Sequence, residues 1–203
     1  VKVDARAEIT MEVNPGSLDI NKVKEFRNAG VNRLSIGVQS FNNRHLRTLG
    51  RTHSAENAQL AVETAKKYFD NINVDLMYAL PGQTKKELNS DLRKIIQADI
   101  NHVSIYQLTV EPHTYFWKNR PNLPNDELAL QMEEIIMDVI NKEGFKQYEI
   151  SGFAKENFES RHNINYWKFG DYLGLGAGAH SKISDYNGTV RIEKPKSPKL
   201  YMV

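Results

Sequence analysis

Four apolar segments of this chain each run into a polar residue where a β-strand should end, and a helical pattern follows each one. The segments cover residues 7–12, 33–39, 72–78 and 103–107. Such alternation predicts a parallel sheet with right-handed crossovers. Strands that are buried on both faces read as nearly continuous apolar runs, so a polar residue at a carboxyl end indicates a ligand site there.

The recurrence of polar ends on successive strands favours an α/β barrel or partial barrel. A doubly wound open sheet is the alternative, but its ligand site would concentrate at one switch point. Each polar side chain could instead cap a neighbouring helix or face water. Four strand ends of the same kind weaken that explanation.

Several residues mark where the expected helices begin and end. Ser54 is suited to start a helix, Thr84 and Glu87 form a predicted capping box, and Gly30 and Gly144 follow helical patterns as carboxyl-terminal stops. A short strand is expected over residues 147–150. From about residue 153 the sequence becomes aromatic, Asn-rich and Gly-rich. We therefore expect residues 1–152 to form the central part of a barrel and residues 153–203 to form an extension. Val1 leads almost directly into a strand, which indicates a segment of a longer protein, truncated at the amino end.

Composition narrows the possible partners. Lys and Arg total 27 against 25 Asp and Glu, and a formal charge of +2 supplies no broad basic field for nucleic acid. No apolar stretch approaches the roughly 18 residues of a transmembrane helix, so a cytoplasmic location is expected. The chain contains no cysteine. It can form no disulfide and can offer no thiolate to zinc or an iron–sulfur cluster.

The first candidate site consists of Glu12, Gln39, Arg51 and Asp75. In a barrel these side chains would meet at one mouth, where they suit a zwitterionic ligand that bears hydroxyl groups. Arg could clamp a carboxylate, while Asp or Glu could accept hydrogen bonds from ribose hydroxyls or from an ammonium group. The alternative for Arg51 is a surface cation at a helix end.

The second candidate site lies in residues 161–167 and contains His162, Asn163, Tyr166 and Trp167. These side chains could ligate and stack against a planar cofactor that carries a metal. The alternative is a loop that packs on its aromatic residues, with His162 hydrogen-bonded.

A Gly-rich segment, residues 174–181, loosely matches a dinucleotide-binding fingerprint. No βαβ unit follows it, so we interpret it as tight backbone packing near a ligand. The remaining histidines at positions 45, 53, 102 and 113 lack the spacing of metal ligands and are expected to be structural or to face solvent.

Taken together, the motifs at residues 12–15, 33–41, 74–84 and 174–181 resemble the oxygen-independent coproporphyrinogen III oxidase group of radical S-adenosylmethionine proteins. The resemblance runs over nearly the whole chain. Within that group, the His-Asn-Ile-Asn-Tyr-Trp sequence at residues 162–167 is similar to a motif of the HemW branch, which is described as a haem chaperone.

This resemblance implies a partial TIM-like barrel of the radical S-adenosylmethionine type, followed by the start of a carboxyl-terminal extension. It implies that four side chains contact S-adenosylmethionine, and that Thr109 lies in a further contacting stretch; the four are Glu12, Gln39, Arg51 and Asp75. The family's Cys-x-x-x-Cys-x-x-Cys loop is missing from the chain and is expected upstream of Val1. The intact protein would then hold a 4Fe-4S cluster, S-adenosylmethionine and haem.

The function that follows for the intact protein is delivery of haem to an acceptor protein, with His162 as an axial or nearby haem contact. One alternative is an oxygen-independent coproporphyrinogen III oxidase, which makes two vinyl groups by oxidative decarboxylation. The motif at residues 162–167 argues against it. A scaffold or interaction module is the third possibility, and it predicts that the polar strand ends bind nothing.

Overall fold

The chain forms two compact units, which divide between Glu159 and Ser160. The structure is a computed structural model that describes residues 3–203, so Val1 and Lys2, which begin the expected barrel segment, lie outside the described residues. The expected boundary after residue 152 would cut strand β6 (Gly152–Ala154). Because β6 pairs with β4 (His102–Gln107), it belongs to the first unit.

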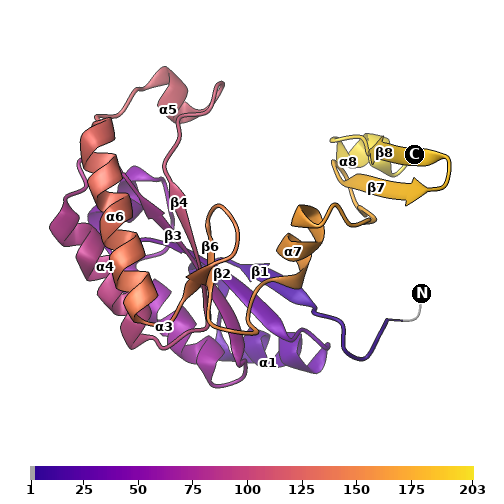
Figure 1. Cartoon of the computed structure of the whole chain (residues 1–203), viewed down its shortest axis with the longest axis horizontal. Helices are drawn as coiled ribbons and strands as arrows, with labels where there is room; N and C mark the ends of the chain where they lie inside the picture. Colours follow the sequence, from indigo (N-terminus) through magenta and orange to yellow (C-terminus); the bar gives the residue numbers. More distant parts are fainter. Residues whose placement is uncertain (1–2) are drawn as a thin grey trace. The chain divides into compact units, whose positions relative to one another are not determined.

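A six-stranded sheet in the order β1-β2-β3-β4-β6-β5 forms the first unit (Figure 1). The remaining strands are β1 Thr10–Val13, β2 Arg33–Gln39, β3 Asn71–Tyr78 and β5 Lys146–Gln147. Strands β1 to β4 pair in parallel, as the alternating pattern predicts. This is the mixed α/β architecture expected for a partial TIM-like barrel of the radical S-adenosylmethionine type.

The single strand expected over residues 147–150 is wrong. Two short antiparallel strands, β5 and β6, occupy this region instead. The chain reverses between them, where the Tyr148 N–H donates to the Gly152 carbonyl at 3.1 Å and Gln147 Nε2 donates to the Ile150 carbonyl at 2.9 Å. These bonds satisfy the backbone within a turn, so Ile150 cannot continue a strand.

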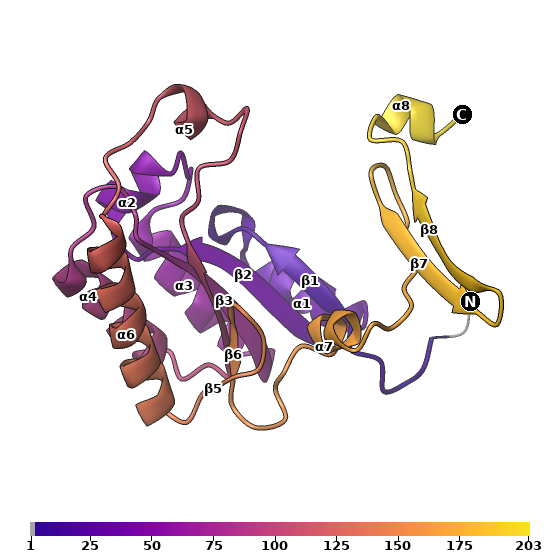
Figure 2. The same cartoon turned by 45° about the horizontal axis from the view of Figure 1, so that its top comes forward.

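The longer helices cover one face of this sheet, as Figures 1 and 2 show. The helical segments of this unit are η1 Pro15–Ser17, α1 Ile20–Asn28, α2 Asn43–Thr48, α3 Ala55–Lys66, α4 Lys85–Gln97, α5 Tyr115–Lys118 and α6 Asp126–Lys142. Both expected starts are confirmed: Ser54 caps α3, and Thr84 with Glu87 forms a reciprocal capping box on α4.

The two faces of the sheet differ in polarity. Along β2, Leu34, Ile36 and Val38 are fully buried in the hydrophobic core that the helices complete. The alternate residues, which include Ser35 and Gly37, point to the opposite face because strand side chains alternate with a period of two. The face away from the helices is therefore free to carry polar groups.

The second unit contains α7 (Arg161–Trp167), the hairpin of β7 (His180–Asp185) and β8 (Gly188–Glu193), and α8 (Pro198–Tyr201). The loop interpretation of residues 161–167 is wrong, because Ser160 caps a helix there by accepting from the Asn163 N–H at 3.4 Å. The Gly-rich segment does pack tightly. A Cβ on Gly174 would overlap the His180 main chain, and the Gly174 N–H donates to Ser181 Oγ at 2.9 Å.

Between residues 3 and 203, no helix combines the length and the apolar character that crossing a membrane requires.

Candidate ligand-binding site at the mouth of the sheet

A cavity of about 300 Å³ opens at the carboxyl ends of β1, β2 and β3. It brings together the four side chains of the first candidate site, of which Asp75 lies within β3 and Arg51 lies outside the strands. The lining residues are Glu12, Val13, Asn14, Ser35, Gly37, Gln39, Arg51 and Asp75. Because parallel strands end at the same edge of a sheet, residues far apart in sequence meet here.

Arg51 enters this cavity from the segment between α2 and α3. Its Nη2 atom donates to Asn14 Oδ1 at 2.9 Å and to the Gly37 carbonyl at 3.0 Å. The interpretation of Arg51 as a surface cation at a helix end is therefore wrong. These two bonds use the hydrogens of Nη2 and orient the guanidinium, whose positive charge and remaining N–H groups are suited to a carboxylate.

Gln39 ends β2 with a backbone φ of 69°, a conformation that residues other than glycine rarely adopt. The pairing of β2 with β3 also shifts register between Ile36 and Gln39. Such a conformation persists only where the surrounding structure enforces it, and it recurs at ligand sites. It turns Gln39 toward Gly37, where the Gln39 Nε2 atom would lie 3.2 Å from an added Cβ.

Asp75 and Glu12 supply two carboxylates with different surroundings. Asp75 is half-buried and accepts a 2.8 Å hydrogen bond from Asn73 Nδ2, whereas Glu12 is exposed. Burial raises the pKa of Asp75; the Asn73 hydrogen bond opposes this, and the neighbouring Glu12 charge adds to it. A cationic ligand would offset the desolvation cost of this carboxylate by favourable charge interaction.

Two other predicted polar residues lie elsewhere. Gln107, at the end of β4, accepts a hydrogen bond from the Tyr78 hydroxyl at 3.3 Å. Thr109 is exposed beyond that strand and donates to Glu111 Oε1 at 3.1 Å. Neither belongs to the lining of this cavity within the part of the chain that the structure describes.

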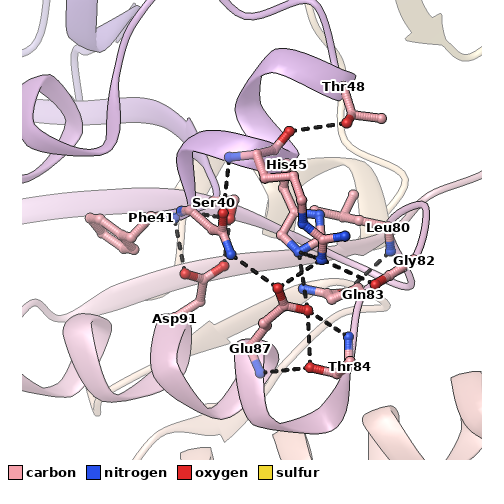
Figure 3. Close-up of polar contacts among 12 residues, drawn as sticks. Ser40, Phe41, His45, Thr48, Leu80, Gly82, Gln83, Thr84, Glu87 and Asp91 are labelled. Atoms are coloured by element: carbon pink, nitrogen blue, oxygen red, sulfur yellow. Dashed lines mark hydrogen bonds and ion pairs between the residues drawn. The ribbon is translucent and has the colours of Figure 1, made fainter.

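A polar clamp joins α2 to the first turn of α4 and to the segment that precedes it (Figure 3). Arg44 Nη2 donates to Glu87 Oε1 at 2.7 Å and to the Gly82 carbonyl at 3.1 Å. Burial alone would raise the pKa of Glu87, but hydrogen bonds from the Thr84 main chain and hydroxyl and from Arg44 outweigh it and lower the pKa to about 2. The clamp fixes α2, which leads directly toward Arg51.

The second candidate group lies on α7. His162 and Tyr166 are four residues apart on one face of this helix, with ring centroids 4.7 Å apart and planes at 86°. Tyr166 also contacts Tyr172, at 4.6 Å between centroids. His162, Tyr166 and Trp167 are exposed, while Asn163 is half-buried at the start of the helix. An exposed imidazole beside aromatic rings could ligate a metal and stack against a planar ligand.

Sequence reasoning missed Asn14, Ser35 and Gly37 in the cavity and Asn73 beside it. One signal could have identified Ser35 and Asn73. Polar residues alternate with apolar residues in β2 and β3, which indicates that the second face of the sheet is polar. Asn14 and Gly37 carried no such signal, because their roles depend on where Arg51 lies.

The residues present suit S-adenosylmethionine but not an iron–sulfur cluster. The cavity offers a guanidinium for a carboxylate, and two acidic side chains for an ammonium group or hydroxyls. The chain contains no cysteine, and the described residues include no group of three or more His, Asp or Glu side chains that could hold a metal ion. No step of a mechanism can therefore be assigned to a cluster from this chain.

Comparisons with known proteins agree with this fold. Residues 2–95 match the family model of the radical SAM superfamily. The solved structure of the radical SAM enzyme coproporphyrinogen III oxidase (HemN) from Escherichia coli superposes with a TM-score of 0.81 at 23% identity, covering 97% of this chain and 48% of that one. The first unit therefore has the fold of a radical SAM protein.

Curated sequences identify the branch more closely. The heme chaperone HemW of Escherichia coli is 42% identical over 200 residues, covering 98% of this chain and 53% of that protein. HemW of Haemophilus influenzae is 44% identical over 197 residues, covering 96% and 51%. The chain is thus a HemW-like member of the radical SAM proteins. It spans about half the length of the curated relatives that it matches.

Proposed function

We propose that the intact protein is a haem chaperone whose cavity at the sheet mouth binds S-adenosylmethionine. The observation that carries the cofactor assignment is the meeting of Glu12, Gln39, Arg51 and Asp75 on one cavity. Similarity to proteins named heme chaperone HemW supports the chaperone function. A cytoplasmic location stays a prediction from the sequence.

The proposal assigns a role to each of these four side chains. Arg51 binds the methionyl carboxylate, because its guanidinium is already oriented by Asn14 and Gly37. Asp75 and Glu12 accept hydrogen bonds from the ribose hydroxyls or the ammonium group, and Gln39 contributes an amide. Thr109 would contact the cofactor from the segment after β4. When bound, S-adenosylmethionine supplies a sulfonium and an adenosyl group.

Haem is the cargo, and α7 is its proposed contact. His162 is exposed and could bind the iron through a ring nitrogen, while Tyr166 and Trp167 present aromatic surface to the porphyrin. Asn163 follows His162 on the same turn of α7 and belongs to the proposed haem contact. The haem would then pass to an acceptor, which must be an apoprotein that binds haem.

Two other functions give different results in the same assay. The structural similarity to coproporphyrinogen III oxidase, at 23% identity, concerns the fold alone. An oxidase would convert coproporphyrinogen III to protoporphyrinogen IX. A scaffold would bind neither S-adenosylmethionine nor haem.

The test uses the full-length protein, reconstituted anaerobically with its cluster. Calorimetry measures S-adenosylmethionine binding, absorbance measures the haem Soret band, and chromatography measures porphyrin products. We expect stoichiometric haem binding without protoporphyrinogen, a Soret band that His162→Ala alters, and cofactor binding that Arg51→Ala weakens. Turnover of coproporphyrinogen III without stable haem binding would establish the oxidase instead.

A further inference from the structure

A chain of buried polar side chains crosses the sheet on the face away from the helices. The strand register places Asn73 beside Ser35 on one side and beside His102 on the other. Asn73 and His102 are 2% and 0% exposed. Beyond His102, in the turn between β5 and β6, the Tyr148 hydroxyl lies 2.7 Å from His102 Nε2. This series of hydrogen-bonded side chains therefore runs from Tyr148 to Asp75, which lines the cavity.

The donor and acceptor of each hydrogen bond in this series of side chains can be assigned. Asn73 Nδ2 donates to Asp75 Oδ1 and to Ser35 Oγ, both at 2.8 Å. A flipped amide would point its oxygen at the Asp75 carboxylate, so the carboxylate selects this orientation. Asn73 Oδ1 must then accept, which it does from Ser104 Oγ at 3.1 Å and from His102 Nδ1 at 2.7 Å.

His102 Nδ1 therefore carries a proton, and the lowered pKa of the buried ring keeps the imidazole neutral. Its Nε2 atom is left as the acceptor for the Tyr148 hydroxyl. Burial lowers the pKa of His102 to about 3, and the buried Arg33 cation adds to this. Arg33 and Tyr148 are the ionisable groups next to the imidazole, and Asp75 lies beyond Asn73.

We propose that Tyr148, His102 and Asn73 are positioning residues that hold one oxygen of the Asp75 carboxylate in place for its cationic, hydroxyl-bearing ligand. This inference rests on the proposed function, because Asp75 needs orienting only if the cavity binds that ligand. Asn73 is the last member and donates directly to Asp75. His102 acts by fixing the Asn73 amide, and Tyr148 by satisfying the far nitrogen of the imidazole.

The first test is spectroscopic and uses the unmodified full-length protein before its cluster is loaded. Selective labelling of histidine with ¹⁵N reports the protonation of each imidazole nitrogen. We expect one histidine with Nδ1 protonated and Nε2 unprotonated, unchanged between pH 5 and pH 8. If every neutral histidine carries its proton on Nε2, or if every histidine titrates within that range, the inference is overturned.

The second test compares S-adenosylmethionine affinity in variants of the reconstituted full-length protein by calorimetry. His102→Leu removes the donor to Asn73 and should weaken binding about tenfold. This is the effect expected from losing one hydrogen bond that supports the charged Asp75. His102→Asn can place an amide N–H near the position of Nδ1 and should restore affinity to within about threefold. Absence of rescue would show a general packing defect and overturn the inference.

Arg51→Ala separates this inference from the proposed function. If Arg51→Ala weakens binding and His102→Leu does not, the positioning role is wrong and the cofactor site stands. If neither variant changes the affinity, the cofactor assignment itself fails, and the inference fails with it. Should His102→Leu not fold, the tautomer of the unmodified protein decides.

Discussion

The Gly37 carbonyl accepts a 3.0 Å hydrogen bond from Arg51 Nη2, and a Cβ added to Gly37 would lie 3.2 Å from that same nitrogen. The backbone of β2 thus orients the guanidinium, and the missing side chain lets it approach. Asn14 completes the arrangement from the segment after β1. Local backbone and a distant arginine together form one wall of the cavity.

Gly37→Ala should therefore weaken S-adenosylmethionine binding about fivefold, because the methyl group displaces Arg51 and Gln39 by a few tenths of an ångström. Calorimetry on the reconstituted full-length protein measures the affinity. Gly30→Ala is the control. Gly30 has a φ of 96° and nothing within 4 Å of an added Cβ, so its substitution should lower stability by about 1 kcal/mol and leave binding unchanged. Equal effects of the two variants on affinity would contradict the role of Gly37.

Asp75→Asn should weaken cofactor binding about tenfold without lowering stability at pH 7. The folded pKa of Asp75 is raised above its ordinary value of 3.8, mainly by burial. The charged form therefore costs stability above the folded pKa, and this cost disappears as the pH falls below 3.8. Asparagine keeps an acceptor for Asn73 and removes the charge.

Calorimetry and denaturant unfolding at pH 7 measure these two effects of Asp75→Asn. The exposed Asp70→Asn is the matched control and should change neither. A clear loss of stability in Asp75→Asn, with affinity retained, would assign Asp75 a purely structural role.

Glu87→Gln should reduce the sensitivity of the protein to acid. Hydrogen bonds from Thr84 and Arg44 hold the folded pKa at about 2, below the ordinary value of 4.5. The ionised carboxylate therefore stabilises the protein above pH 4.5, and this contribution is lost as the pH falls through about 2. Glutamine should cost about 1–2 kcal/mol at pH 7 and flatten the decline of stability toward pH 2.

Urea unfolding at a series of pH values checks the Glu87 prediction. Glu63→Gln serves as control, because Glu63 is exposed and accepts a hydrogen bond from Gln59 Nε2 at 3.0 Å on the same helix. Parallel pH profiles for the unmodified protein and Glu87→Gln would show that the clamp contributes nothing.

Asp91→Ala should destabilise the protein by about 2–3 kcal/mol, because two buried donors lose their acceptor. Asp91 accepts from Ser40 Oγ at 2.7 Å and from the Phe41 N–H at 3.0 Å, which ties α4 to the end of β2 (Figure 3). Asp138→Ala breaks an exposed pair with Lys142 and should change stability by less than about 0.5 kcal/mol. Guanidinium unfolding separates the two variants, and similar losses would remove the special role of Asp91.

Local sequence predicted most of the first unit. The helix starts at Ser54 and Thr84 could be predicted because each capping box joins residues three positions apart in the sequence. Gln39, which ends β2, and Asp75, which lies within β3, were identified because polar residues interrupt apolar runs. The same reasoning failed at residues 161–167, where no amphipathic pattern marks the helix that Ser160 caps.

The sequence by itself determined the alternation of strands and helices, and the polar residues that interrupt the apolar strand segments. These features depend on spacing, capping and burial preference within short windows. Only the tertiary structure decided that Arg51 lies against Gly37, and that Tyr148 reaches Asp75 through His102 and Asn73. Strand register and the path of the turns create these contacts, and a hydrogen bond between residues far apart in the chain leaves no periodic trace in the sequence.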